Sequence, residues 1–254
     1  MRIFGLIGYP LTHSFSHNYF KEKFRREIIT NTSYELFPIS DIKEFSTLIA
    51  THPNLLGLNV TIPYKEQIIP FLTELEATAK IIGAVNCIKI KHSLSGQVSL
   101  KGFNTDAYGF SQSIKPFLKN HYRKALILGN GGASKAVEYA LKKTGIETIK
   151  VSRNAKSKPY KADFLYSELT KEIIQSCQLI INTTPMGTFP DIHNYPQIPY
   201  EHLTTKHFLY DLVYNPEETE FLKRGKLNGA KTMNGINMLK LQADKSWKIF
   251  NLQD

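Results

Sequence analysis

Near the middle of the chain the sequence reads Lys124-Ala125-Leu126-Ile127-Leu128-Gly129-Asn130-Gly131-Gly132-Ala133-Ser134, and this stretch indicates the fold. Its first five residues are typical of a buried strand, and a glycine-rich turn follows them. A helix is predicted next, because small and apolar residues recur at the spacing of one helix face: Ala133, Ala136, Val137, Ala140 and Leu141. Such a strand, turn and helix can hold a pyrophosphate against the N–H groups of the helix N-terminus. A tight turn without a ligand is the alternative.

The end of the next strand bears on the choice of dinucleotide. That strand is expected at 147–152, and Ser152, Arg153 and Asn154 stand at its end, where an NAD site would have Asp or Glu for the ribose 2′-hydroxyl. Residues 150–161 contain no Asp or Glu. They do contain several basic residues: Lys150, Arg153, Lys156, Lys158 and Lys161. A guanidinium at this place can pair with a 2′-phosphate. We therefore expect NADP rather than NAD, with a solvated basic loop as the alternative.

Strand-like and helix-like stretches alternate along the whole chain, which favours an α/β fold with mainly parallel sheets. Before the glycine turn, strands are expected at 2–8, 33–38, 55–60, 85–91 and near 97–102, and helices at 16–28, 41–51 and 74–82. After it, strands are expected at 147–152, 178–182 and 207–213, and a last helix at 236–250. The sequence does not decide which unit that last helix packs against.

Composition limits the classes of protein. The chain has 254 residues, two cysteines and a formal net charge of +10. No apolar run approaches the roughly 20 residues of a membrane span, and the apolar run at residues 3–8 reads as a first strand rather than a signal peptide. Two cysteines cannot form a disulfide framework, so a reducing cytoplasm is the simplest location. The charge alone suggests nucleic-acid binding, but no basic run is long and none carries an RNA-binding motif.

Short polar motifs lie at the ends of predicted strands in the first half, at residues 8–16, 59–65, 83–86 and 102–106. The serines of the first motif can hold a ligand carboxylate or simply cap a helix. Pro63 suits the first turn of a helix, which would place Lys65 one turn into it. Asp106 would begin another helix, and an ordinary N-cap is its alternative role.

Together and in this order, these motifs resemble the shikimate dehydrogenase family over nearly the whole chain. Residues 59–65 match that family's N-V-T-x-P-x-K motif, and residues 102–106 match its G-x-N-T-D motif. The glycine turn is similar to the family's G-A-G-G-A-S form, with Asn130 in place of the first alanine, and Cys87 replaces the threonine of G-A-V-N-T. Further similar motifs lie at residues 182–187, 211–216 and 235–243.

The resemblance implies a two-domain α/β enzyme that reversibly reduces 3-dehydroshikimate to shikimate with NADP, in aromatic amino-acid biosynthesis. Residues 1–102 and 234–254 would form the substrate domain and residues 103–233 a Rossmann-like cofactor domain. The implied catalytic pair is Lys65 and Asp106. Hydride arriving at a ketone carbon leaves charge on oxygen, and the Lys65 ammonium could stabilise that charge or donate the proton. The sequence leaves open which of the two it does.

The remaining implied sites follow residue by residue. Substrate contacts would be Ser14, Ser16, Asn59, Thr61, Asn86, Tyr214 and Gln242. Cofactor contacts would be Gly129, Gly131, Gly132, Ala133, Ser152, Arg153, Asn154, Lys156, Thr183, Met186, Gly235 and Met238. No metal site is expected.

Two other functions stay open. A quinate/shikimate dehydrogenase that uses NAD would share the fold, but Arg153 without a neighbouring acidic residue argues against it. A catalytically silent NADP-binding regulator would not need both Lys65 and Asp106. We expect a small-molecule substrate, no nucleic-acid or membrane partner, and either a monomer or a homodimer.

Overall fold

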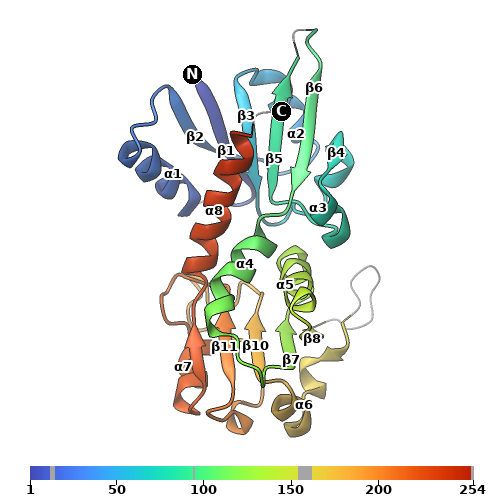
Figure 1. Ribbon diagram of the computed structural model, residues 1–254, viewed down its shortest axis with the longest axis vertical. Helices are drawn as coiled ribbons and strands as arrows, with labels where there is room; N and C mark the ends of the chain where they lie inside the picture. Colours follow the sequence, from blue (N-terminus) through green and yellow to red (C-terminus); the bar gives the residue numbers. More distant parts are fainter. Residues whose placement is uncertain (12–14, 94, 154–161, 253–254) are drawn as a thin grey trace. The chain divides into compact units, whose positions relative to one another are not determined.

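The computed structural model describes residues 1–11, 15–93, 95–153 and 162–252. Ser14, Asn154 and Lys156 of the predicted site lie outside these described residues. The chain divides into two compact units, and each is described by itself: Met1–Thr105 with Gln242–Asp254, and Asp106–Leu241 (Figure 1).

The first unit contains a six-stranded mixed sheet in the order β2-β1-β3-β5-β6-β4. The strand β1 pairs in parallel with both β2 and β3, whereas β5 runs antiparallel to β3 and β6. The expected parallel character therefore holds for the N-terminal strands and is interrupted by β5. The strand bounds are β1 Arg2–Gly8, β2 Thr32–Pro38, β3 Leu55–Val60, β4 Glu74–Leu75, β5 Cys87–His92 and β6 Val98–Phe103.

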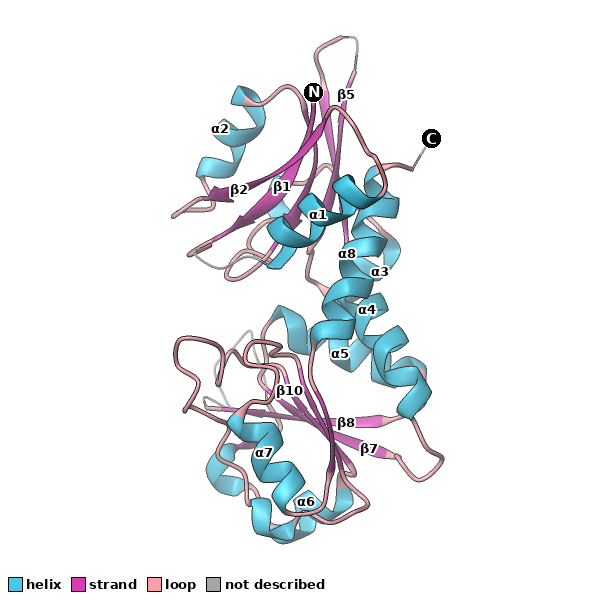
Figure 2. Ribbon diagram, turned by 90° about the vertical axis from the view of Figure 1, so that its left-hand side faces the viewer, coloured by secondary structure: helices cyan, strands magenta, loops and turns pink. Residues whose placement is uncertain are grey.

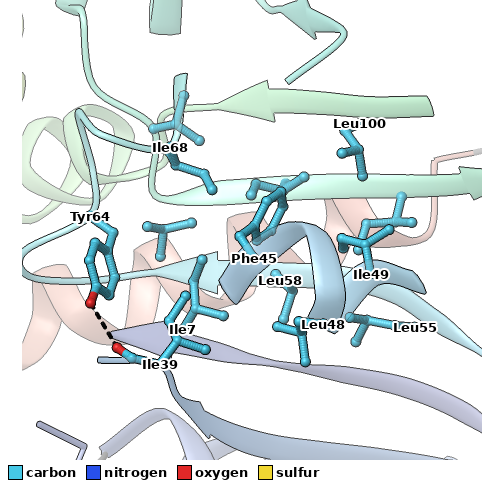
Figure 3. Packing of buried hydrophobic residues seen from close by; sticks show 14 of the residues in the cluster. Ile7, Ile39, Phe45, Leu48, Ile49, Leu55, Leu58, Tyr64, Ile68 and Leu100 are labelled. Carbon is cyan, nitrogen blue, oxygen red and sulfur yellow. Dashed lines mark hydrogen bonds between the residues drawn. The ribbon is translucent and has the colours of Figure 1, made fainter. Parts of the chain in front are cut away.

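Helices cover both faces of this sheet (Figure 2). Their bounds are α1 Phe15–Arg26, α2 Glu44–Thr51, α3 Ala77–Ile82 and α8 Ile236–Phe250, with a short 3-10 turn η1 at Ile69–Phe71. On one face, Phe45 and Leu48 of α2 pack against Ile7 and Leu58, and Tyr64 donates a 2.7 Å hydrogen bond to the carbonyl of Ile39 (Figure 3). Each fully buried side chain of this size stabilises the fold by about 1.5–3 kcal/mol.

The opposite face carries α1 and the C-terminal part of α8. Phe4 of β1 lies in one buried cluster with Phe20 of α1 and Phe250 of α8, and the rings of Phe4 and Phe250 stack at 5.1 Å. Lys23 of α1 is nearly buried, and its ammonium lies 2.9 Å from the carboxylate of Asp244 on α8. The C-terminal part of the last helix thus returns to the first unit, which confirms what the family resemblance implied.

The second unit is a parallel sheet in the order β12-β11-β10-β7-β8-β9. If β7 is numbered as the first strand and the sheet is read from β9 to β12, the strand order is 3-2-1-4-5-6, as in a doubly wound dinucleotide-binding fold. The switch point of that fold lies between β7 and β10. The strand bounds are β7 Lys124–Leu128, β8 Glu147–Ser152, β9 Phe164–Leu165, β10 Leu179–Asn182, β11 Phe208–Asp211 and β12 Lys231–Met233.

Helices again lie on both faces of the second sheet. Phe110 of α4 and Val137 of α5 pack on one side with Tyr210, whereas Ile174 of α6 and Phe221 of α7 pack on the other. The bounds are α4 Asp106–Ile114, α5 Gly132–Lys143, α6 Lys171–Ser176 and α7 Glu220–Leu227, with 3-10 turns η2 Lys115–Phe117, η3 Tyr166–Glu168 and η4 Tyr200–His202.

Several predicted bounds are wrong, and the helix expected at 41–51, for example, begins only at Glu44. The helix expected at 74–82 begins only at Ala77, because the Glu76 carboxylate accepts from the N–H groups of Thr78 and Ala79 and caps it there, while Glu74–Leu75 forms β4. The strand expected at 207–213 ends at Asp211.

Within the described part of the chain, no helix is long and apolar enough to span a bilayer.

Candidate active site

The polar motifs of the first unit meet at one edge of its sheet. The parallel strands β1 and β3 end side by side, with Ile7 opposite Val60. The antiparallel β5 begins at that same edge, and there Cys87 lies opposite Phe103 at the end of β6. Four motifs far apart in the sequence therefore converge at this edge, where open α/β sheets hold their ligands.

Two of the predicted substrate residues are joined in a buried network at this edge. Asn86 is 2 % exposed, and its amide nitrogen donates to Thr105 Oγ1 at 2.9 Å and to Gln242 Oε1 at 3.4 Å. Thr105 is fully buried, and its backbone N–H donates to Asn86 Oδ1 at 2.6 Å. Because the Gln242 oxygen faces Asn86 and Thr105, its amide N–H groups are turned away from the network and can donate to a ligand.

Asn59 extends this network toward the first helix. Its amide nitrogen donates to the carbonyl of Asn86 and, at 2.8 Å, to Ser246 Oγ, and its oxygen accepts from the hydroxyl of Tyr34 at 2.9 Å. Burial raises the pKa of Tyr34 well above its usual value, although a hydrogen bond with Ser16 lowers it. Ser16, Asn59, Asn86 and Gln242 are thus linked through side chains within one unit.

Lys65 lies in a run of turns rather than one turn into a helix, so that prediction is wrong. The carbonyl of Lys65 accepts a 2.7 Å hydrogen bond from the N–H of Val85, and the N–H of Ile69 goes to Glu66 instead. In an α-helix the N–H of Ile69 would donate to the Lys65 carbonyl. Because that carbonyl accepts from Val85 instead, no helix forms at Lys65. The segment is anchored at the same edge, because the N–H of Thr61 donates to the carbonyl of Ile7 at 3.0 Å. The Lys65 and Thr61 side chains are both half-buried.

Asp106 begins α4, as the sequence predicted, and it is 6 % exposed. It directly follows Thr105, the residue that binds Asn86. The pairing of Asp106 with Lys65 in catalysis stays a prediction.

The glycine turn lies at the switch point of the second sheet. Gly129 has φ of 110°, and a side-chain carbon there would lie 2.6 Å from Thr183 Oγ1. Thr183 in turn donates to the carbonyl of Leu128 at 2.7 Å, so the ends of β7 and β10 are held together. Only glycine fits this position without strain.

The N-terminus of α5 fits a dinucleotide phosphate. Gly131 is its N-cap and is exposed, with open space where a side chain would stand and no side-chain cap on the first N–H groups. Gly132 and Ala133 form the first turn. In that turn Ser134 Oγ is fully buried and has no hydrogen-bond partner among the described residues. Unpaired N–H groups and small residues are what a pyrophosphate needs at such a helix.

Arg153 stands exposed just beyond β8, while Ser152 is buried at the strand end. Lys150 is not available for a phosphate, because its ammonium lies 3.0 Å from the carboxylate of Glu138. Arg153 forms no ion pair with any residue in the described ranges.

The residues predicted near the nicotinamide lie in the loops after β10 and β12 and on α8, and Tyr214, a predicted substrate contact, lies in the loop after β11. Met186 and Tyr214 are half-buried, and Met238 is buried on α8. A side chain at Gly235 would collide with the carbonyl of Leu212, so this approach also requires glycine. Asn234 caps α8, since its side-chain oxygen accepts from the N–H of Ile236 at 3.2 Å.

Comparison with known proteins agrees with this arrangement. Residues 6–88 match the family model described as the shikimate dehydrogenase substrate binding domain. A shikimate dehydrogenase (NADP(+)) of Methanosphaera stadtmanae is 36% identical over 98% of this chain and 90% of its own length. The chain belongs to the shikimate dehydrogenase family. The crystal structure of shikimate dehydrogenase 1 from Peptoclostridium difficile is 36% identical, with a TM-score of 0.85 over 98% of this chain and 92% of that one.

A more distant family member shows what such a fold can hold. The enzyme of Thermus thermophilus, solved in complex with NADP(H) and shikimate, is 28% identical, with a TM-score of 0.83 over 100% of this chain and 95% of its own.

Across the described residues of the present chain, no group of three or more His, Cys, Asp or Glu side chains could bind a metal ion.

Sequence reasoning did not assign Tyr34, Thr105 or Ser246 to the site. The four-residue spacing between Gln242 and Ser246 puts both on one face of α8, and that signal could have identified Ser246. Tyr34, in the middle of a strand, gave no comparable signal.

Proposed function

We propose that the chain catalyses the NADP-dependent, reversible reduction of 3-dehydroshikimate to shikimate. The observation that carries the proposal is near full-length similarity to proteins named shikimate dehydrogenase (NADP(+)), among them one of Carboxydothermus hydrogenoformans that is 38% identical over 94% of this chain. The gathering of the family's polar motifs at one sheet edge supports it.

The substrate belongs to the first unit. Ser14 and Ser16, at the start of α1, would hold its carboxylate, while Thr61 and the amides of Asn59, Asn86 and Gln242 would face its ring hydroxyls, with Tyr214 as a further contact. The buried network supports this role, because side chains fixed by hydrogen bonds do not lose further rotational freedom when they bind.

The cofactor belongs to the second unit. The N-terminus of α5 would receive the pyrophosphate, and Arg153 would pair with the 2′-phosphate through a charge-assisted hydrogen bond. Ser152, Asn154 and Lys156 would complete the adenosine side, and Thr183, Met186, Gly235 and Met238 the nicotinamide side. The bound dinucleotide supplies the hydride.

Lys65 and Asp106 would carry the proton chemistry. In the reducing direction, negative charge develops on the carbonyl oxygen as its carbon accepts hydride, and the Lys65 ammonium stabilises that charge and can release a proton to it. In the oxidising direction, Lys65 takes the hydroxyl proton, and the Asp106 carboxylate orients that hydroxyl. Opposite charges at these two residues would couple their titrations.

Two accompanying assignments remain part of the proposal. We place the protein in the cytoplasm, because Cys87 and Cys177 are both buried and unbridged. We expect a monomer or a homodimer in solution, without nucleic acid or membrane as partner.

The test combines two substrates with two cofactors. Purified protein receives shikimate or quinate together with NADP or NAD, and the absorbance of the reduced nicotinamide is followed. We expect the highest kcat/KM for shikimate with NADP. Preference for quinate with NAD would favour the related NAD-dependent enzyme. Tight NADP binding without turnover of either substrate would indicate a silent regulator.

A further inference from the structure

Asp211 is a fully buried carboxylate at the end of β11, outside the predicted substrate and cofactor contacts. Three groups donate hydrogen bonds to it. Asn182 Nδ2 and the backbone N–H of Val213 reach Oδ1 at 2.9 and 3.0 Å, and the hydroxyl of Thr219 reaches Oδ2 at 2.5 Å. A buried carboxylate with this many donors is costly to remove, because each donor would lose its partner.

One of these donors controls the loop after β10. Asn182 is fully buried, and its side-chain oxygen accepts from the N–H and the hydroxyl of Thr184 at 3.0 and 2.6 Å. The hydroxyl of Thr184 then accepts from the N–H of Met186. The Asp211 carboxylate thus fixes which way the Asn182 amide is turned, and that orientation shapes the loop that carries Thr183 and Met186.

The other two donors control the loop after β11. The N–H of Val213 bonds to Asp211, and the carbonyl of Val213 accepts from Gly235 at 3.1 Å. The hydroxyl of Thr219 caps α7, where it accepts from the N–H of Leu222. The loop that carries Tyr214 is therefore tied to the carboxylate both at its start and at the helix that follows it.

We propose that Asp211 is a positioning residue that fixes the loop after β10, which carries Met186 on the nicotinamide side of the cofactor site, and the loop after β11, which carries Tyr214 and holds Gly235. This inference rests on the proposed function for the identity of the cofactor. Asp211 touches neither substrate nor cofactor, and it acts through Asn182, Val213 and Thr219. Because hydride transfer needs close alignment of donor and acceptor carbons, small displacements of these loops lower the rate of transfer.

The test compares Asp211→Ala with Asp211→Asn. Both are assayed at a temperature where circular dichroism shows the same folded fraction as for the parent protein. We expect Asp211→Ala to lower kcat/KM for NADP about 10- to 100-fold, since misplaced loops cost catalysis on that scale. Shikimate affinity, measured without cofactor, falls much less, because every proposed substrate contact except Tyr214 lies in the first unit. Asp211→Asn keeps one oxygen for Asn182 and Val213, so it restores most of the lost kcat/KM.

Thr170→Ala provides the matched control. Thr170 caps α6 in the same unit, where its hydroxyl accepts from the N–H of Ile173. This variant loses a helix cap without disturbing Asp211, so it lowers the melting temperature and leaves kcat and both KM values unchanged.

Two results would overturn the inference. One is an Asp211→Ala protein that is less stable but kinetically normal, and the other is an asparagine variant as defective as the alanine variant. If the parent protein turns over no shikimate, the proposed function is wrong, but the inference about Asp211 can still be tested separately. Calorimetric NADP affinity then decides the role of Asp211: a loss in the alanine variant that asparagine restores supports it, and unchanged affinity overturns it.

Discussion

Asn86 and Thr105 are joined by a reciprocal pair of hydrogen bonds: the N–H of Thr105 donates to Asn86 Oδ1 at 2.6 Å, and Asn86 Nδ2 donates to Thr105 Oγ1 at 2.9 Å. This pair connects the start of β5 with the end of β6, directly before Asp106. It fixes the orientation of the Asn86 amide, and through Gln242 it ties the C-terminal helix to the same sheet edge.

Thr105→Val tests the network. Valine keeps the shape of the side chain but leaves the Asn86 amide nitrogen and the Ser246 hydroxyl short of a partner, which costs about 1–3 kcal/mol of stability. We expect a lower melting temperature and a KM for shikimate raised by about tenfold, as for a lost 1.4 kcal/mol. Thr148→Val is the control, because Thr148 Oγ1 is buried with no partner among the residues that the structure describes, and its loss costs nothing. An unchanged KM in Thr105→Val would refute the role of the network.

Gly129→Ala tests the glycine turn. Alanine at φ of 110° is strained, and its side chain would press on Thr183, so we expect destabilisation of about 1–3 kcal/mol together with weaker NADP binding by calorimetry. Gly145→Ala is the control, since Gly145 also has positive φ but open space around it. The Gly145→Ala variant should lower stability without weakening NADP binding. Normal NADP affinity in Gly129→Ala would speak against a phosphate site at this turn.

Arg153→Ala tests the choice of cofactor. A lost charge-assisted contact to a 2′-phosphate weakens binding about 10- to 100-fold, so the Kd for NADP should rise by that factor while the Kd for NAD stays the same. Lys150→Gln serves as the control, because the Lys150 ammonium is already paired with Glu138. Equal losses for both dinucleotides would show that Arg153 does not read the 2′-phosphate.

The buried carboxyl of Asp211 should make the free energy of unfolding depend on pH. Burial raises its pKa to about 7, whereas in the unfolded chain it is about 4. Between these values the folded protein holds a proton that the unfolded chain has released, so stability falls as pH rises through this window and levels off above it. The free energy of unfolding of the parent, relative to Asp211→Asn, should fall by a few kcal/mol from about pH 4 to 7. A constant difference across this range would contradict the raised pKa.

The sequence predicted what depends on local pattern. The last helix occupies 236–250 as expected, because its apolar residues repeat at helical spacing and pack on Phe4 and Phe20. The turn at Lys65 could not be predicted, because its carbonyl is taken by Val85, twenty positions away in the sequence. Tyr34 was missed for a similar reason: a tyrosine in a strand looks like packing until Asn59 is seen beside its hydroxyl.

The most direct test of the account is the turnover of Lys65→Ala with shikimate and NADP, beside Lys80→Ala as an exposed control on α3. Loss of a general acid–base group predicts a kcat lowered by about 10²- to 10⁴-fold, with shikimate still bound in calorimetry and with Lys80→Ala unaffected. A Lys65→Ala enzyme with the kcat of the parent protein would contradict the account.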